Sequence, residues 1–215
     1  MFNYYLNKFV SNICCKLFLK KINGLKNLPT KGGYIVAANH VSYLDIWVMY
    51  VMFLDKAKTY IRFIAKRRLV KDAYFRITKF LFGNEKNKVI ILNAKMPEKA
   101  FKESTTALKK ESIVCIYPEG ERSPNGRIQK GKTGMIRLAL LAKVPIIPVG
   151  LKGTFELMPK GKSMPKIKKN VIISIGKPIY LDYYYNRKMT KKLLRKLTDD
   201  VMKNIAKLIG QEYNY

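Results

Sequence analysis

Short apolar runs alternate along this chain with longer stretches in which apolar residues recur every three or four positions. The short runs predict strands at 34–38, 60–65, 89–92, 113–117, 146–149 and 171–175. The longer stretches predict helices at 46–54, 66–82, 97–110, 131–143 and 191–209. Because strands alternate with helices, we expect a single α/β domain with a largely parallel, mixed sheet flanked by helices. Pro145 and Pro148 bound the 146–149 run and predict an edge or irregular strand there.

The first 22 residues have a pattern of their own, with large apolar side chains, several lysines and no acid. Their longest apolar run falls far short of the roughly 20 residues that span a bilayer, and no small-residue cleavage site of a secretory signal follows. We therefore expect a basic amphipathic helical segment over 1–23 that lies in the membrane interface, and one domain over 24–215. The alternative is a helix packed on that domain, with its lysines merely solvated.

The charge of the chain indicates its partners. Lys and Arg number 43 against 14 Asp and Glu, which gives a formal net charge of +29. Such an excess favours an anionic partner, which is a phospholipid surface, a nucleic acid or a phosphate-rich substrate. Because 48% of the residues are hydrophobic, the charge does not come from a disordered basic tail. The stretch from Lys56 to Lys79 contains nine basic residues and a single acid, Asp72. This composition predicts a surface that binds anionic headgroups, and a merely solvated helix face is the alternative.

The cysteines argue against a disulfide framework and against zinc. Cys14 and Cys15 are adjacent, Cys115 is remote from them, and the chain has one histidine. No cysteine pair has the spacing of metal ligands, so we expect no metal site. Free thiols suit the reducing, cytosolic side of a membrane.

The single histidine, His40, falls where the 34–38 run ends and the next helix begins. Ser42 and Asp45 fit a capping box at the start of that helix. His40 and Asp45 are five residues apart, which places them roughly 140° out of line on an ideal helix. They meet only if His40 precedes the helix and Asp45 lies in its first turn. Such a pair fixes one ring nitrogen and leaves the other as a base; the alternative is a surface histidine near an ordinary capping carboxylate.

A second polar stretch, 118–123, follows the 113–117 run directly. Gly120 lies between two carboxylates and allows unusual backbone angles or the close approach of a ligand. Arg122 carries the guanidinium fork that binds a phosphate through two hydrogen bonds. If Glu119 is held beside Arg122, it can orient the arginine or accept a hydrogen bond from a ligand hydroxyl. An ordinary solvent turn with a local ion pair is the alternative.

Residues 126–133 match the phosphate-binding pattern G-x-x-x-x-G-K-[ST] letter for letter. That chemistry requires the loop to leave a strand directly, so that backbone N–H groups wrap the phosphate. Here the preceding strand ends at Tyr117 and a turn intervenes, and no apolar strand ending in a magnesium-binding aspartate follows. A P-loop nucleotidase therefore stays a remote alternative. So does a basic nucleic-acid-binding module, for which the chain has no motif.

The two polar stretches together resemble a known family. Residues 39–45, Asn-His-Val-Ser-Tyr-Leu-Asp, are similar to the N-H-x-S-x-x-D motif of the glycerolipid acyltransferases, specifically the lysophosphatidic acid acyltransferase (1-acylglycerol-3-phosphate O-acyltransferase) family. Residues 117–123 resemble its F-P-E-G-T-R-S motif, residues 144–149 its V-P-I-I-P-V strand, and Lys130-Gly131 its basic-Gly segment. The resemblance covers roughly residues 24–180, in the order and spacing of the family.

The resemblance implies an enzyme that moves a fatty acyl group from acyl-CoA or acyl carrier protein to lysophosphatidic acid and forms phosphatidic acid in phospholipid biosynthesis. His40 is implied as the general base and Asp45 as the carboxylate that orients it. No metal and no dissociable cofactor are implied, and no nucleic acid partner is expected. The implied place is peripheral or monotopic, on the cytoplasmic face of the cell membrane. Substrate binding is implied for Glu119, Gly120, Arg122, Ser123, Lys88, Lys130 and Gly131.

The chain departs from the family pattern at two places. The G-x-I-F-I-D-R-like block of the third strand corresponds to residues 87–95, which lack the arginine associated with the phosphate of the acceptor. Lys88 or Lys95 is a possible substitute, as a point charge without the guanidinium fork. Glu121 replaces the usual threonine. Another lysolipid, such as a lyso-aminolipid, is therefore the alternative acceptor.

Overall fold

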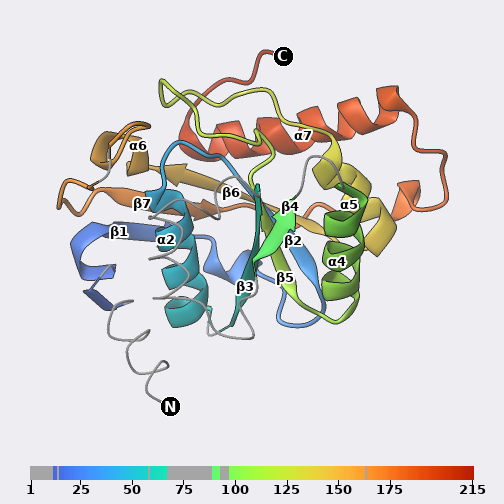
Figure 1. The fold of residues 1–215 in the computed structure, drawn as a ribbon, viewed down its shortest axis with the longest axis horizontal. Coiled ribbons are helices and arrows are strands. Elements are labelled where there is room, and N and C mark those ends of the chain that lie inside the picture. The colour runs from blue at the N-terminus through green and yellow to red at the C-terminus, as the bar shows by residue number, and fades with distance from the viewer. Residues whose placement is uncertain (1–11, 14, 58, 67–88, 93–96, 163) are drawn as a thin grey trace.

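The computed structural model describes residues 12–13, 15–57, 59–66, 89–92, 97–162 and 164–215 (Figure 1). The strands are β1 (Leu19–Asn23), β2 (Tyr34–Ala38), β3 (Ile61–Lys66), β4 (Ile90–Leu92), β5 (Ile113–Ile116), β6 (Ile146–Lys152) and β7 (Val171–Ile175). The α-helices are α2 (Leu44–Val51), α4 (Pro97–Lys109), α5 (Gly134–Ala142), α6 (Thr154–Leu157) and α7 (Lys191–Ile209). Shorter helical segments are η1 (Leu25–Asn27), the π-helical η2 (Met52–Lys56) and η5 (Asp182–Tyr184).

In the described part of the chain, seven strands form one sheet in the order β1-β7-β6-β2-β5-β3-β4. β2 pairs in parallel with β5 and β6, and β3 pairs in parallel with β5 and β4. β1 is parallel to β7, whereas β6 and β7 are antiparallel. The predicted α/β class with a largely parallel, mixed sheet is therefore confirmed.

β2 lies in the middle of the sheet and is buried on both faces. Its alternate side chains enter two cores: Val36 packs on the side of α2, and Ile35 packs on the side of α4, α5 and α7. Because both faces are covered, β2 is a continuous apolar run without polar alternation. The predicted strands 34–38 and 171–175 match β2 and β7 residue for residue. The polar residues that follow β2 therefore emerge at the carboxyl end of a central parallel strand, where sites of α/β folds lie.

Of the two alternatives predicted for 146–149, the edge strand is wrong, whereas the pairing on one side of the strand is irregular: β7 pairs only from Val149 onward. β6 is longer than predicted and lies between β2 and β7. Pro148 is tolerated because its backbone, like that of Ile146, is directed toward the chain that follows β7 and not toward a fully paired strand. There Gly176 donates to the Pro148 carbonyl at 2.8 Å, and Ile179 exchanges two hydrogen bonds with Ile146. The missing N–H of the proline thus falls in the gap between these two contacts.

The prediction for the N-terminal segment is partly corrected. Residues 15–18 are helical, but residues 19–23 form β1, which pairs with β7 because Leu19 and Ile22 pack on the same core as α2. These residues belong to the sheet and not to a separate helical segment. The rest of the predicted amphipathic helix lies mainly outside the described residues, as does the predicted basic helix from residue 67 onward. No helix of the described part is long and apolar enough to cross a membrane.

The helix predictions differ from the structure mainly at the helix starts. α4 and α7 match the predicted 97–110 and 191–209 closely. α7 begins after Thr190, whose side chain accepts from the Leu193 N–H, and ends at Gly210 with a φ of 72°. α5 begins at Gly134 because the preceding residues form a loop held by other segments.

We predict that Gly150→Ala lowers the free energy of unfolding by about 1–3 kcal/mol, as overpacking does. Gly150 of β6 lies against α7, and a Cβ added there falls 2.7 Å from the Leu208 Cβ and 2.8 Å from the Ile209 Cγ2. Urea denaturation should show a lower midpoint with an unchanged slope. Gly134→Ala is the matched control, because its added Cβ meets its nearest neighbour at 3.6 Å. Equal losses in both variants would contradict this account.

Candidate active site

His40 lies in the turn between β2 and α2, which we call the His40 turn (residues 39–43). Asp45 follows as the second residue of α2. The His40 Nδ1 lies 2.8 Å from the Asp45 Oδ2, so the two side chains meet as their spacing predicted. Asp45 is fully buried, whereas 11% of the His40 side chain is exposed. The imidazole therefore joins a buried carboxylate to the protein surface.

The Asp45 carboxylate also fixes the backbone of the His40 turn. In addition to His40, its Oδ2 accepts hydrogen bonds from the N–H groups of Val41 and Ser42, each at 2.8 Å. Because a carboxylate only accepts, the ring nitrogen that faces it carries the proton. His40 is therefore held as the Nδ1–H tautomer, which leaves a lone pair on Nε2.

Two buried polar side chains connect the His40 turn to distant segments. The Asn39 side chain accepts from the Leu151 N–H at 2.7 Å and donates to its carbonyl at 2.9 Å, which joins the turn to β6. The Ser42 Oγ accepts from the Leu44 N–H at 3.0 Å and donates to the Met158 carbonyl at 2.6 Å. In the usual capping box the Ser hydroxyl accepts from the N–H three residues later, whereas Ser42 accepts from the N–H two residues later, that of Leu44.

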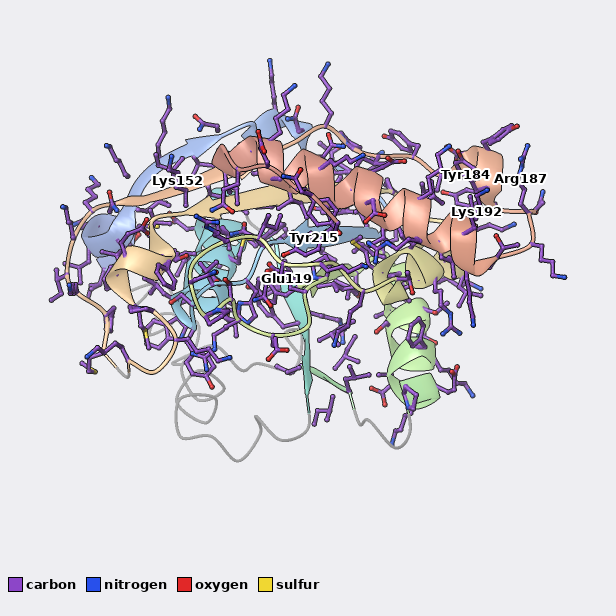
Figure 2. The ribbon with its side chains drawn as sticks, turned by 90° about the horizontal axis from the view of Figure 1, so that it is seen from above. Glu119, Lys152, Tyr184, Arg187, Lys192 and Tyr215 are labelled. Carbon is purple, nitrogen blue, oxygen red and sulfur yellow. The ribbon has the colours of Figure 1, made fainter. Side chains whose placement is uncertain are left out.

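Glu119, in the stretch after β5, holds the backbone of the His40 turn. Its Oε1 accepts from the His40 N–H at 2.7 Å and its Oε2 from the Gln129 N–H at 2.9 Å. The Ser123 N–H in turn donates to the His40 carbonyl at 2.8 Å. Burial raises the pKa of Glu119 to about 8, although the two N–H groups oppose the shift. Glu119 is buried, and Figure 2 shows it near the middle of the molecule, where each of its carboxylate oxygens accepts from a backbone N–H group.

Tyr117, the residue after β5, fixes the plane of the imidazole. Its ring stacks on His40 with centroids 4.1 Å apart and planes inclined by 20°. Stacking holds the ring at one side while Asp45 holds one edge. Two directions of His40 motion are thus restricted, one by the residue after β5 and the other by the first turn of α2.

Arg122 and Lys132 bring positive charge to this surface. The Arg122 guanidinium carbon lies 3.5 Å from the centroid of the Tyr43 ring, a cation–π contact that gives the side chain one orientation. Gly120 has a φ of 77°, and a Cβ added there would lie 3.0 Å from the Lys132 Nζ. The ammonium group of Lys132 therefore lies directly over Gly120. Together these two cations provide a place for an anionic group close to the His40 turn.

Of the three other predicted site residues, the two that the structure describes lie on the loop before α5. Gly131 packs against α7: an added Cβ would lie 2.7 Å from the Met202 Cγ, and Arg195 donates to the Gly131 carbonyl at 2.7 Å. Lys130 is exposed on the same loop. Lys88 lies outside the described residues.

The stretch that matches the P-loop pattern does not present its backbone to a phosphate. Several of its N–H groups donate to protein acceptors, namely those of Arg127 to Asn125, Ile128 to Gln211, Gln129 to Glu119, Gly131 to Tyr213, and Lys132 to Pro118. A P-loop needs these donors free to surround the phosphate. Residues 126–133 therefore match the P-loop pattern in sequence but do not form a phosphate-binding loop.

The cysteines and the acids offer no second centre among the described residues. Cys115 is buried in β5, and its burial raises the pKa of the thiol; in the described part of the chain neither Cys15 nor Cys115 forms a disulfide. No group of three or more His, Cys, Asp or Glu side chains in the described ranges has the arrangement of a metal site.

Tyr43, Tyr117 and Lys132 are residues of the site that the sequence patterns do not predict. Both tyrosines lie within the two motifs, and an aromatic residue three positions after the histidine is a weak signal for a stacking partner. In the sequence, Lys132 belongs only to the P-loop match. Its place over Gly120 depends on the path of residues 126–132, which no local pattern predicts.

Comparison with known proteins identifies the family. The profile of the acyltransferase family matches residues 20–152. A chloroplastic 1-acyl-sn-glycerol-3-phosphate acyltransferase of Brassica napus is 31% identical over 184 residues, which are 83% of this chain and 51% of the relative. A 1-acyl-sn-glycerol-3-phosphate acyltransferase of Borreliella burgdorferi is 26% identical over 163 residues, which are 74% of this chain and 58% of the relative. The chain thus spans about half the length of the curated relatives it matches.

A solved structure agrees with these matches. The crystal structure of the 1-acyl-sn-glycerophosphate (LPA) acyltransferase PlsC from Thermotoga maritima superposes with a TM-score of 0.71 at 26% identity, and the match covers 99% of this chain and 81% of PlsC. The profile covers both polar stretches, including the His40–Asp45 pair and the Glu119 support. The chain therefore belongs to the acyltransferase family that contains these 1-acyl-sn-glycerol-3-phosphate acyltransferases, as its two motifs indicated.

Proposed function

We propose that this protein transfers a fatty acyl group from a thioester to the free hydroxyl of a lysophospholipid, with His40 as the general base. The observation that carries the proposal is the 2.8 Å contact between the His40 Nδ1 and the Asp45 Oδ2 at the carboxyl end of β2. This contact holds one partly exposed imidazole in one tautomer, and Arg122 lies over Tyr43 of the same turn. The names of the relatives support acyl transfer to 1-acylglycerol-3-phosphate.

In the proposed reaction the His40 Nε2 takes the proton of the acceptor hydroxyl as its oxygen attacks the thioester carbonyl. The imidazolium that forms is stabilised by Asp45, which stays a carboxylate. The carbon–sulfur bond then breaks, and the departing thiolate takes the proton from Nε2. The products are the acylated lipid and a free thiol, and His40 is regenerated.

Direct transfer is proposed in preference to a covalent acyl-enzyme. The Ser42 hydroxyl donates to the Met158 carbonyl and is fully buried, so its proton points away from His40. Cys115 is buried within β5, and the raised pKa of its thiol disfavours the nucleophilic thiolate. These two side chains therefore lack the arrangement of an activated nucleophile.

Arg122 is proposed to bind the phosphate of the acceptor, assisted by Lys132 and the backbone near Gly120. Its orientation over Tyr43 presets the guanidinium for a bidentate contact. Lysophosphatidic acid is the proposed acceptor, and acyl-CoA or acyl carrier protein the proposed donor. Since residues 87–95 lack the arginine of the family block, another lysolipid is the second candidate acceptor. The net charge of +29 supports a peripheral or monotopic place on the anionic cytoplasmic face of the cell membrane.

His40→Ala is expected to lower kcat about 10²–10⁴-fold, the usual contribution of a positioned general base. Parent and variant would be incubated with a long-chain acyl-CoA or acyl carrier protein and a panel of lysolipids, while released thiol is followed. The unfolding midpoint of the variant should stay close to that of the parent. His40-dependent release with lysophosphatidate supports the proposal, and release with another lysolipid alone keeps the mechanism but replaces the acceptor. No release from either donor would overturn acyl transfer.

Arg122→Ala is expected to raise the KM for the acceptor about tenfold or more, with a smaller effect on the KM for the thioester, because a charged hydrogen-bond partner of the phosphate is lost. Arg122→Lys should recover part of this loss, since it restores the charge without the fork. Arg127→Ala, which removes an exposed arginine of the same loop region, is the control and should leave both constants unchanged. Equal increases for both substrates would remove Arg122 from the acceptor site.

Glu119→Gln is expected to change the stability of the fold in a pH-dependent way, because it replaces a buried carboxyl group, whose pKa the fold raises, by an amide that does not titrate. The folded state raises the pKa of Glu119 from 4.5 to about 8. The protonated carboxyl group therefore contributes to the stability of the fold at low pH, and this contribution is lost as the pH rises through 8. The stability advantage of the parent should therefore shrink between pH 5 and 9. Urea denaturation of both proteins measures it, with the exposed Glu121→Gln as the control. An advantage that grows with pH would contradict the assignment.

A further inference from the structure

The loop between α6 and β7, residues 158–170, exposes apolar side chains to solvent. Met164 is 79% exposed and Ile167 is 73% exposed, the two highest values among the exposed large hydrophobic residues described. A backbone hydrogen bond ties the loop to the end of α6, because the Lys166 N–H donates to the Leu157 carbonyl at 2.9 Å. Two large apolar side chains are thus displayed on a defined support.

The same loop is strongly basic. It has five lysines, at positions 160, 162, 166, 168 and 169, and no acid. All five are exposed. Apolar side chains surrounded by lysines are the composition of segments that bind anionic lipid surfaces, where the apolar groups enter the acyl boundary and the ammonium groups stay with the headgroup phosphates.

The position of the loop connects it with the N-terminal segment. The Asn170 N–H donates to the Phe18 carbonyl at 3.1 Å, and Ile13 nearby in sequence is 40% exposed. Phe18, which directly precedes β1, therefore meets the end of this loop at the β1–β7 edge of the sheet (Figure 1). In Figure 2 this end of the molecule carries Lys152, and it lies opposite the end with Tyr184 and Arg187.

The loop is also joined to the His40 turn. The Met158 carbonyl accepts from the Ser42 Oγ at 2.6 Å, and the Lys160 Nζ lies 4.0 Å from the Glu121 Oε2. A surface that holds this loop therefore holds the catalytic turn at a fixed distance from itself.

We infer that the loop 158–170 is a second membrane contact, in which Met164 and Ile167 insert into an anionic phospholipid surface and its lysines bind the headgroups. The surface contact itself follows from exposure and charge. Its purpose, to bring His40 to an acceptor that resides in the same surface, rests on the proposed function.

Met164→Ser with Ile167→Ser is expected to weaken binding to vesicles of phosphatidylcholine and phosphatidylglycerol by about tenfold or more, measured by co-sedimentation of the full chain. Leu141→Ser is the matched control, because Leu141 is 46% exposed on α5, on the other face of the sheet. The control should bind as the parent does. Parental binding by the double variant, or an equal loss in the control, would overturn the inference.

Activity separates this inference from the proposed function. The double variant should retain parental turnover on a monomeric short-chain acceptor and lose turnover on acceptor presented in the vesicles. A parent without turnover on either would refute the proposed function, while the vesicle binding still decides the role of the loop. If the double variant lost binding to a single-stranded oligonucleotide and kept binding to vesicles, the partner of this surface would be a nucleic acid and the inference would be wrong.

Discussion

One carboxylate oxygen holds the site together. The Asp45 Oδ2 accepts from a side chain, His40, and from two successive backbone N–H groups, those of Val41 and Ser42. The turn and the imidazole are consequently fixed by the same atom, and neither can move without breaking contacts of a fully buried charge, which is expensive in a low-dielectric interior. This constraint explains why the tautomer of His40, the start of α2 and the end of β2 form one unit.

The remainder of the site is assembled on this unit by the sheet order. Since β2 lies between β5 and β6, the residues after β5 and the end of β6 reach the His40 turn from opposite sides. Glu119 supports the His40 backbone from the β5 side, and Leu151 holds Asn39 from the β6 side. The stretch 126–132, whose letters resemble a nucleotide loop, is instead a spacer that connects α7 to Glu119 through Gln129.

The sequence predicts those parts of the fold and site that depend on local patterns. β2 and β7 are continuous or alternating apolar runs, α7 has a strong 3.6-residue period with caps, and the meeting of His40 with Asp45 follows from one capping signal. The errors arise where contacts between distant segments decide which secondary structure a residue adopts. Pro148 was compatible with the interior because the chain beyond β7 leaves a gap at its missing donor, and residues 19–23 became a strand because β7 offered an edge. The stacking of Tyr117 on His40 likewise depends on the neighbouring strand ends.

The long sequence separations of these contacts have a consequence for synthesis. Asn39 and Ser42 bond to residues 112 and 116 positions further along the chain, and His40 to one 79 positions away. Each contact closes a large loop, so its entropy must be offset by the assembled sheet before it forms. Asp45 holds the His40 turn locally, whereas the contacts of Asn39 and Ser42 can form only after Leu151 and Met158 have been synthesised. The full set of contacts around His40 therefore belongs to the completed sheet and not to the chain segment around the histidine.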